Sequence, residues 1–187
     1  KEARRRKITN VAMPKTWDNI PNGYFRFIPD YFIVQNELSR ELAGLYQDIK
    51  KDKVFVVGMP QFDWYSRPDI IRSREEHWGS KGFDPNKRVI FFGSAGIWSA
   101  NDHAVAELIY GWIENNELAK DCQLFVRPHF SNVGDDVFKK LRGKKGVVID
   151  SYSVSNTFSD NWDPTVAGTI DFTNSVYHCD IMINIGS

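Results

Sequence analysis

The stretch Val89-Ile90-Phe91-Phe92-Gly93-Ser94-Ala95-Gly96 decides the fold class of this chain. Four consecutive apolar residues followed by small residues predict a fully buried strand that ends in a tight turn. The segment that begins at Asp102 is helical in spacing, because Val105 and Ile109 fall on one face of a helix. A buried strand, a turn and a helix in this order are typical of a parallel α/β sheet, whose strands are covered by helices on both faces.

The same alternation extends in both directions along the chain. Upstream, Asn36 is a predicted N-cap for a helix over 37–46, which has leucines at helical spacing. Downstream, Asp171 is the predicted cap of a helix over 172–178. We therefore predict an α/β fold with Rossmann-like, doubly wound parallel sheets. The other predicted strands cover residues 8–13, 32–34, 54–57, 124–126, 147–149 and 181–185.

Residues 63–87 lack a clear period and are rich in Pro, Gly, Arg and Trp. We predict a linker over 66–87, which joins a first domain over 1–65 to a second domain over 88–187. The first predicted strand has nothing upstream to pair with, and the last one ends where a helix should follow. We therefore expect an incomplete two-domain fragment whose natural polypeptide is longer at both ends.

Charge and hydropathy exclude several classes of protein. The chain has 24 basic and 24 acidic residues, so nothing global favours nucleic acid. The basic run at 4–7 is either a solvated helix end or a patch that touches anionic lipid or a phosphate-bearing acceptor. No apolar run approaches the roughly 20 residues of a membrane helix, so we expect a cytoplasmic protein, soluble or peripheral at the membrane. Cys122 and Cys179 lack metal-site spacing and are expected to be reduced thiols.

The turns that follow the strands carry the candidate site residues, because open α/β sheets bind ligands at the carboxyl ends of their strands. Gly93-Ser94 is either a phosphate-binding turn or a plain tight turn. Arg127 offers a charged fork suited to phosphate, and His129 can donate to a phosphate or a sugar hydroxyl. The alternative for this segment is a surface loop with a salt-bridged arginine. We expect the turns after Phe92, Val126 and Ile185 to meet in space.

Two further strand ends, at Gly186-Ser187 and Asp18, are candidates. Gly186-Ser187 is a second turn of the phosphate-binding type, or an ordinary one. Asp18 is either a catalytic base or part of a turn. The remaining histidines have no partner at a spacing that indicates a metal, so no metal site is predicted; they are His77, His103 and His178.

Several motifs resemble the GT-B glycosyltransferases. Thr16-Trp17-Asp18-Asn19-Ile20 and the run Pro29 to Glu37 resemble the interdomain region of that family, and Lys53 to Asp63 resembles the strand and turn that follow it. Val126-Arg127-Pro128-His129 is similar to a segment of surface-carbohydrate enzymes that include the CDP-glycerol glycerophosphotransferases, although Phe130 replaces a proline of that pattern. Cys179 to Ser187 looks like the strand and loop that bind the donor.

The resemblance implies a metal-independent glycosyltransferase that needs no cofactor. It transfers a sugar from a nucleotide-diphosphate donor to a polysaccharide or a lipid-linked acceptor, in bacterial cell-wall synthesis at the inner face of the membrane. The alternatives are a CDP-alditol phosphotransferase, a sugar-nucleotide epimerase, and a binding module or fragment without activity. We predict catalytic roles for Asp18 and His129, and the resemblance implies donor contacts from Gly93, Ser94, Arg127, His129, Gly186 and Ser187.

Overall fold

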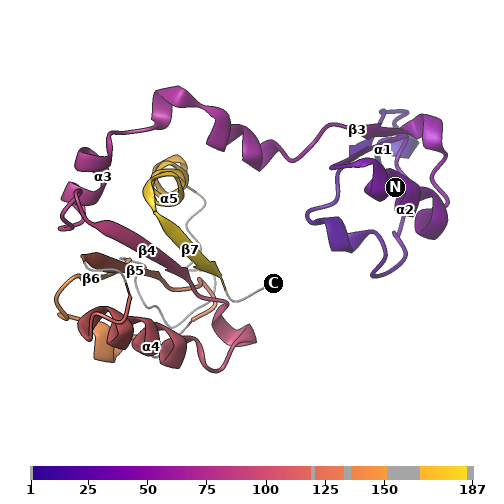
Figure 1. Ribbon diagram of the computed structural model, residues 1–187. Helices are drawn as coiled ribbons and strands as arrows, with labels where there is room; N and C mark the ends of the chain where they lie inside the picture. Colours follow the sequence, from indigo (N-terminus) through magenta and orange to yellow (C-terminus); the bar gives the residue numbers. More distant parts are fainter. Residues whose placement is uncertain (1, 119–120, 133–135, 151–164, 185–187) are drawn as a thin grey trace. The chain divides into compact units, whose positions relative to one another are not determined.

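The computed structural model describes residues 2–118, 121–132, 136–150 and 165–184. The chain divides into two compact units, Lys1–Ser66 and Arg67–Ser187, which are described separately below. Both units are built on parallel sheets with helices against them, so the predicted α/β class is confirmed (Figure 1).

The first unit is a small parallel sheet with one long helix against it. Its strands are ordered β1-β2-β3, and Phe32 lies opposite Val54 in the register. The strands predicted around Ile33 and Phe55 are therefore confirmed, whereas the strand predicted over 8–13 is only two residues long. The elements are α1 (Glu2–Arg5), β1 (Val11–Ala12), β2 (Tyr31–Val34), α2 (Glu37–Gln47) and β3 (Val54–Val56).

Helix α2 starts where the sequence predicts. The Asn36 side chain accepts a hydrogen bond from the backbone N–H of Ser39 at 2.8 Å, as an N-cap does. The buried residues of α2 are Ser39, Ala43 and Gln47, while Leu38 is 62% exposed. The buried face of α2 thus consists of two small side chains and a glutamine, which the leucine spacing does not show.

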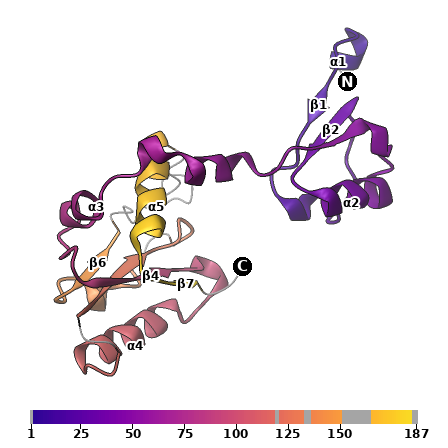
Figure 2. The ribbon, with the colours of Figure 1, turned by 45° about the horizontal axis from the view of Figure 1, so that its top comes forward.

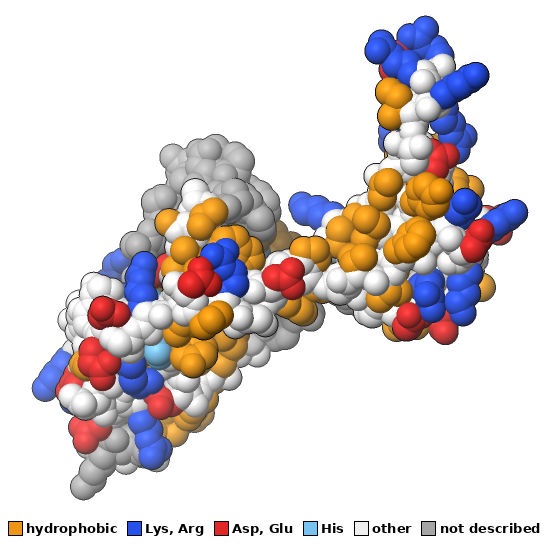
Figure 3. Space-filling model, turned by 90° about the horizontal axis from the view of Figure 1, so that it is seen from above, with side chains coloured by type: hydrophobic (Ala, Val, Ile, Leu, Met, Phe, Trp, Pro, Cys, Tyr) orange, Lys and Arg blue, Asp and Glu red, His pale blue; other side chains and the backbone are white. Residues whose placement is uncertain are grey.

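The surface of the first unit is apolar in one region and basic in another. Tyr31 and Phe55 are exposed on neighbouring strands, and their ring centroids are 5.9 Å apart. Hydrophobic side chains gather on this unit in Figure 3, and basic ones gather at the end that holds α1. Arg5 and Arg6 both pair with Glu2, at 2.6 and 2.7 Å, so part of the charge of the basic run is compensated locally.

The second unit is a four-stranded parallel sheet in the order β6-β5-β4-β7 (Figure 2). Strand β4 lies between β5 and β7, so the chain returns past β4 to reach the far edge of the sheet. Such a reversal of strand order is where doubly wound folds place their ligands. The elements are α3 (Arg74–Ser80), β4 (Arg88–Gly93), α4 (Asp102–Glu114), β5 (Cys122–Arg127), β6 (Val147–Ile149), α5 (Val166–His178) and β7 (Ile181–Asn184).

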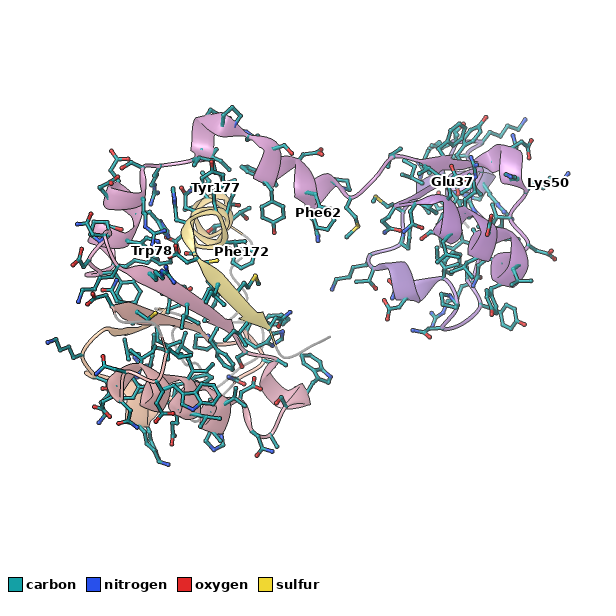
Figure 4. The ribbon with its side chains drawn as sticks, in the orientation of Figure 1. Glu37, Lys50, Phe62, Trp78, Phe172 and Tyr177 are labelled. Atoms are coloured by element: carbon teal, nitrogen blue, oxygen red, sulfur yellow. The ribbon has the colours of Figure 1, made fainter. Side chains whose placement is uncertain are left out.

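Helices cover both faces of this sheet, as the continuous apolar strands predict. Helix α4 packs on one face, where Ile109 contacts the cluster that contains Ile90 and Leu124. Helices α3 and α5 lie on the other face, with Trp78 and Phe172 directed toward the strands (Figure 4). The alternation of side chains along β4 therefore divides one apolar run between two cores.

The segment expected to be a linker, 66–87, contains helix α3, and residues from Arg67 onward lie in the second unit. Ser73 caps the helix by accepting from the backbone N–H of Glu76 at 3.1 Å, and the Glu76 carboxylate accepts from the backbone N–H of Ser73 at 3.0 Å. Trp78 is fully buried, and its ring lies 5.4 Å from that of Phe125. The burial of Trp78 fixes α3 on the sheet although its sequence has no obvious period.

Helix α5 begins earlier than the sequence predicts, so the prediction for its start was wrong. Its N-cap is Thr165, whose side chain accepts from the backbone N–H of Gly168 at 3.1 Å. Asp171, the predicted cap, lies inside the helix and pairs with Lys81 of the loop after α3 at 2.9 Å. In the sequence Asp171 resembles the N-cap of a helix, because its true partner, Lys81, is distant in the chain.

Candidate functional site

The carboxyl ends of β4, β5 and β7 lie side by side. Gly93, the last residue of β4, is opposite Arg127 on one side and Asn184 on the other. The backbone N–H of Ser94 donates to the carbonyl of Arg127 at 3.0 Å, which joins the turns after β4 and β5. The turns after Phe92 and Val126 therefore meet, whereas Gly186 and Ser187 lie outside the described residues.

A cavity of about 230 Å³ opens at this edge of the sheet. An added Cβ on Gly93 would lie 3.4 Å from the Phe91 ring and 3.9 Å from the Asn184 side-chain oxygen, which are ordinary contact distances, so Gly93 forms part of the wall between the strand ends. Polar groups from β5 and β7 and aromatic rings share the wall. The lining residues are Phe91, Gly93, Ser94, Arg127, Pro128, His129, Phe130, Phe172, Met182 and Asn184.

The turn after β4 is organised by a buried carboxylate. One oxygen of Asp102 accepts from the Ser94 hydroxyl and the Ala95 N–H, both at 2.6 Å, and from the Gly96 N–H at 3.2 Å. Asp102 is 3% exposed, so these bonds are shielded from water. The donors expected to bind a phosphate at this turn are thus engaged by an internal anion, and Ser94 contributes to the wall of the cavity rather than a free hydroxyl.

Arg127 lies at the end of β5 beside the cavity and is also an ion-pair partner. Its guanidinium donates to Asp150 at 2.7 Å, and the side chains of the pair are 16% and 8% exposed. The guanidinium also lies 4.8 Å from the centre of the Phe172 ring. The salt bridge of the alternative interpretation is present, and Arg127 also lines the cavity, so phosphate binding by Arg127 stays a prediction.

His129 is held by Ser131 at the same edge. Its Nδ1 accepts the backbone N–H of Ser131 at 3.0 Å and lies 2.6 Å from the Ser131 hydroxyl oxygen. That hydroxyl also accepts the backbone N–H of Ile97 at 3.2 Å. Burial lowers the pKa of His129 from its ordinary value, and the carboxylate of Asp102 opposes this shift. A neutral imidazole at the cavity wall is the consequence near pH 7.

Asp18 belongs to the first unit, in a 3-10 turn over Trp17–Asn19. Its carboxylate accepts from the hydroxyl of Thr16 and from the amide of Asn22, the latter at 3.3 Å. The side chain is half-buried. The expected turn geometry is present, and an aspartate held by two uncharged donors stays chemically able to accept a proton.

The described residues contain no group of three side chains suited to a metal ion. His77 contacts Ser175 at 3.0 Å, and His178 contacts the carbonyl of Arg72 at 2.8 Å, so both stabilise the fold around α3. Cys122 and Cys179 are free thiols whose pKa values are raised by burial. Among the described helices, none is both long and apolar enough to cross a bilayer.

Sequence analysis missed three residues that organise this site. Asp102 was treated only as the start of a helix, Ser131 was not singled out, and Asp150 was an unremarked residue after a strand. Each acts through a contact that the chain forms only on folding. Asp150 and Ser131 could have been predicted only from their position in the sequence. Both follow predicted strands, as ligand-contacting residues of such sheets do.

The fold and the cavity define an α/β protein with a polar site at the carboxyl edge of a parallel sheet. No family model and no curated protein matches the chain. The chain is similar to the wall teichoic acid polymerase TagF at 15% identity and a TM-score of 0.49, over 84% of this chain and 35% of that one. A structure of TagF soaked with CDPG gives 16% identity and a TM-score of 0.42, over 89% and 37%. The chain thus spans little more than a third of these relatives, and its chemistry must be inferred from its own side chains.

Proposed function

We propose that this chain acts in group transfer from a nucleotide-diphosphate donor, with the donor phosphates at the carboxyl edge of the second sheet. The observation that carries the proposal is the register that places Gly93 between Arg127 and Asn184 beside a cavity. Departure of a nucleotide diphosphate increases negative charge on its phosphates. A guanidinium and a neutral imidazole N–H fixed at that point stabilise the developing charge.

We propose the following roles within the site. Arg127 provides the positive charge, and its pair with Asp150 holds the fork in place. His129 provides a hydrogen-bond donor, while Gly93 and Ser94 shape the wall. Asp18 is the proposed base that activates the acceptor, and Gly186 and Ser187 are proposed to contribute further donor contacts. The group transferred is a sugar, and the acceptor is a polysaccharide or a lipid-linked carbohydrate.

One observation favours transfer of an alditol phosphate as a second candidate. The run Val126 to His129, which resembles the CDP-glycerol glycerophosphotransferases, lies at the cavity. Both reactions release a nucleotide bearing phosphate, so the site supports either one. The nucleotide base distinguishes them, because CDP-alditols carry cytidine.

Calorimetric titration of the chain with CDP, UDP and GDP tests the proposal. A preference for CDP supports alditol-phosphate transfer, and a preference for UDP or GDP supports sugar transfer. Asp18→Asn should leave the affinity unchanged, since a base for the acceptor does not touch the donor. Absence of binding by all three nucleotides would contradict the proposed function.

Removal of Arg127 alone is a poor test, because it leaves Asp150 buried without its counter-ion, which costs about 3–5 kcal/mol of stability. We therefore pair Arg127→Gln with Asp150→Asn, which neutralises both partners. The double variant should bind the preferred nucleotide roughly 10- to 100-fold more weakly, the scale of one charged hydrogen bond. The matched control is Lys81→Gln with Asp171→Asn, a second partly buried pair that does not line the cavity. Equal affinity in both double variants would exclude phosphate binding by Arg127.

A further inference from the structure

One nitrogen of the His129 ring is fixed as a hydrogen-bond acceptor. The backbone N–H of Ser131 lies 3.0 Å from Nδ1, and a backbone N–H can only donate. Nδ1 must therefore carry a lone pair, so the proton of the neutral ring is on Nε2. Among the described residues, Nε2 makes no hydrogen bond to the protein.

The hydroxyl of Ser131 reinforces the same tautomer. Its oxygen accepts the backbone N–H of Ile97 at 3.2 Å, which leaves its own hydrogen to point at Nδ1, 2.6 Å away. Ser131 is 1% exposed, so water does not compete for these bonds. Two donors from one residue therefore face Nδ1.

Gly96 makes this arrangement possible from the turn after β4. Its φ of +65° is in the left-handed region, and a Cβ there would lie 2.2 Å from the Ser131 hydroxyl oxygen and 2.8 Å from Nδ1 of His129. Only glycine permits such a close approach of the turn. The turn, Ser131 and the imidazole are thus packed as one unit.

We propose that Ser131 is a positioning residue that holds His129 as a neutral Nε2–H donor facing the ligand of the cavity. The atom that His129 meets is then an acceptor oxygen, and His129 does not serve as the base that takes a proton from an acceptor hydroxyl. Identification of that oxygen with a phosphate of the donor rests on the proposed function. The tautomer rests only on the contacts of Ser131.

The low pKa of His129 agrees with this role. A second ring proton would sit on Nδ1, directed at the N–H and the hydroxyl of Ser131, and burial adds to the cost of the charge. The side chains that face the ring from neighbouring elements are Trp98, Phe130 and Ser131, and Asp102 is the charged group that acts on it. Of these, only Asp102 favours the protonated ring.

Nitrogen-15 NMR of the histidine side chains of the native chain, without ligand, tests the tautomer directly. We expect Nε2 of His129 to be protonated and Nδ1 to be unprotonated at neutral pH. A spectrum that shows the proton on Nδ1 would overturn the proposal without any mutation. Ser131→Ala should shift the tautomer ratio about fivefold toward Nδ1–H, the size expected on loss of one ordinary hydrogen bond.

The matched control is Ser99→Ala, which removes a half-buried hydroxyl from the turn after β4 and should leave the His129 signals unchanged. Backbone amide spectra report whether each variant is folded. If folded Ser131→Ala keeps the native tautomer ratio, Ser131 is not the positioning residue.

On addition of CDP, a shift of the Nε2 resonance supports the donor role, and bound CDP with an unchanged resonance overturns it. Failure of every nucleotide to bind would remove the proposed function but leave the tautomer result standing.

Discussion

At the scale of single residues, the site depends on groups that satisfy one another before any ligand arrives. The Asp102 carboxylate occupies the amides after β4, and the Asp150 carboxylate pairs with Arg127. A turn that looks open in sequence is closed by a side chain six or more residues away. Fewer polar groups therefore face the cavity than the sequence predicts, and both Arg127 and His129 are held in one orientation by another side chain.

Gly96→Ala should disrupt the site more than its size suggests. The residue has a positive φ, and the new Cβ would overlap the Ser131 hydroxyl. Strain and displacement together should cost about 1–3 kcal/mol of unfolding free energy and release the His129 ring from its single tautomer. Chemical denaturation measures the first effect and histidine NMR the second.

Gly111→Ala is the control for this substitution. Gly111 lies inside helix α4, and its added Cβ would meet nothing within 4 Å. Alanine favours the helix there, so stability should rise by about 0.5–1 kcal/mol. If both variants lose stability to the same degree, the close approach at Gly96 is not the cause.

At the scale of elements, local patterns predicted most strands and the starts of α2 and α4, but they missed α3 and placed the start of α5 too late. Val89 to Phe92 and Leu124 to Val126 are apolar throughout because helices cover both faces of the sheet. A continuous apolar run can be recognised in the sequence without knowing which helices pack against it. Helix α3 has no period because its burial depends on Trp78 and His77 alone. Its start could still be predicted, since Ser73 and Glu76 form a capping box in the sequence itself.

His77 connects α3 to α5 and should make the second unit sensitive to acid. It is fully buried, and burial lowers its pKa to about 4. Its Nε2 lies 3.0 Å from the Ser175 hydroxyl oxygen, and because that hydroxyl donates to the carbonyl of Asp171, Nε2 is the donor to Ser175. Asp171 opposes this shift, whereas Lys81, His178 and Arg72 add to it. The unfolded chain therefore takes up the proton first, near the ordinary value of 6.5. Stability is complete above that pH and falls by roughly 3 kcal/mol as the pH drops from 6.5 to 4.

Denaturation of native chain and His77→Gln across this range measures the effect. The glutamine can still donate to Ser175 but does not titrate, so its stability should fall less steeply with acid than that of the native chain. Gly111→Ala, which changes no titratable side chain, should keep the native slope. Parallel curves for the native chain and His77→Gln would show that His77 does not cause the acid sensitivity.

At the scale of the whole molecule, the boundary between the two units is the point where sequence and structure differ most. The composition of 66–87 predicts a connection, because Pro and Gly residues usually interrupt regular structure. The contacts place Arg67 onward in the second unit. Arg74 donates to the carbonyls of Pro85 and Lys87 and to Asp180, which ties α3 to the amino ends of β4 and β7. Contacts over a hundred residues apart leave no periodic trace in the sequence.

Two truncated chains distinguish these boundaries. A chain that starts at Arg67 keeps α3 and should unfold cooperatively, with the amide spectrum of the second unit preserved. A chain that starts at Arg88 lacks Trp78 and Phe83 and exposes Phe125, which both rings contact. Loss of one buried tryptophan typically costs about 3–5 kcal/mol, a large share of the roughly 5–15 kcal/mol that stabilises a domain, and this truncation removes Phe83 as well. The shorter chain should therefore be unfolded or molten, as judged by near-ultraviolet circular dichroism and amide dispersion. If it folds as well as the longer one, 66–87 is a connection after all, and the core on the α5 face is complete without α3.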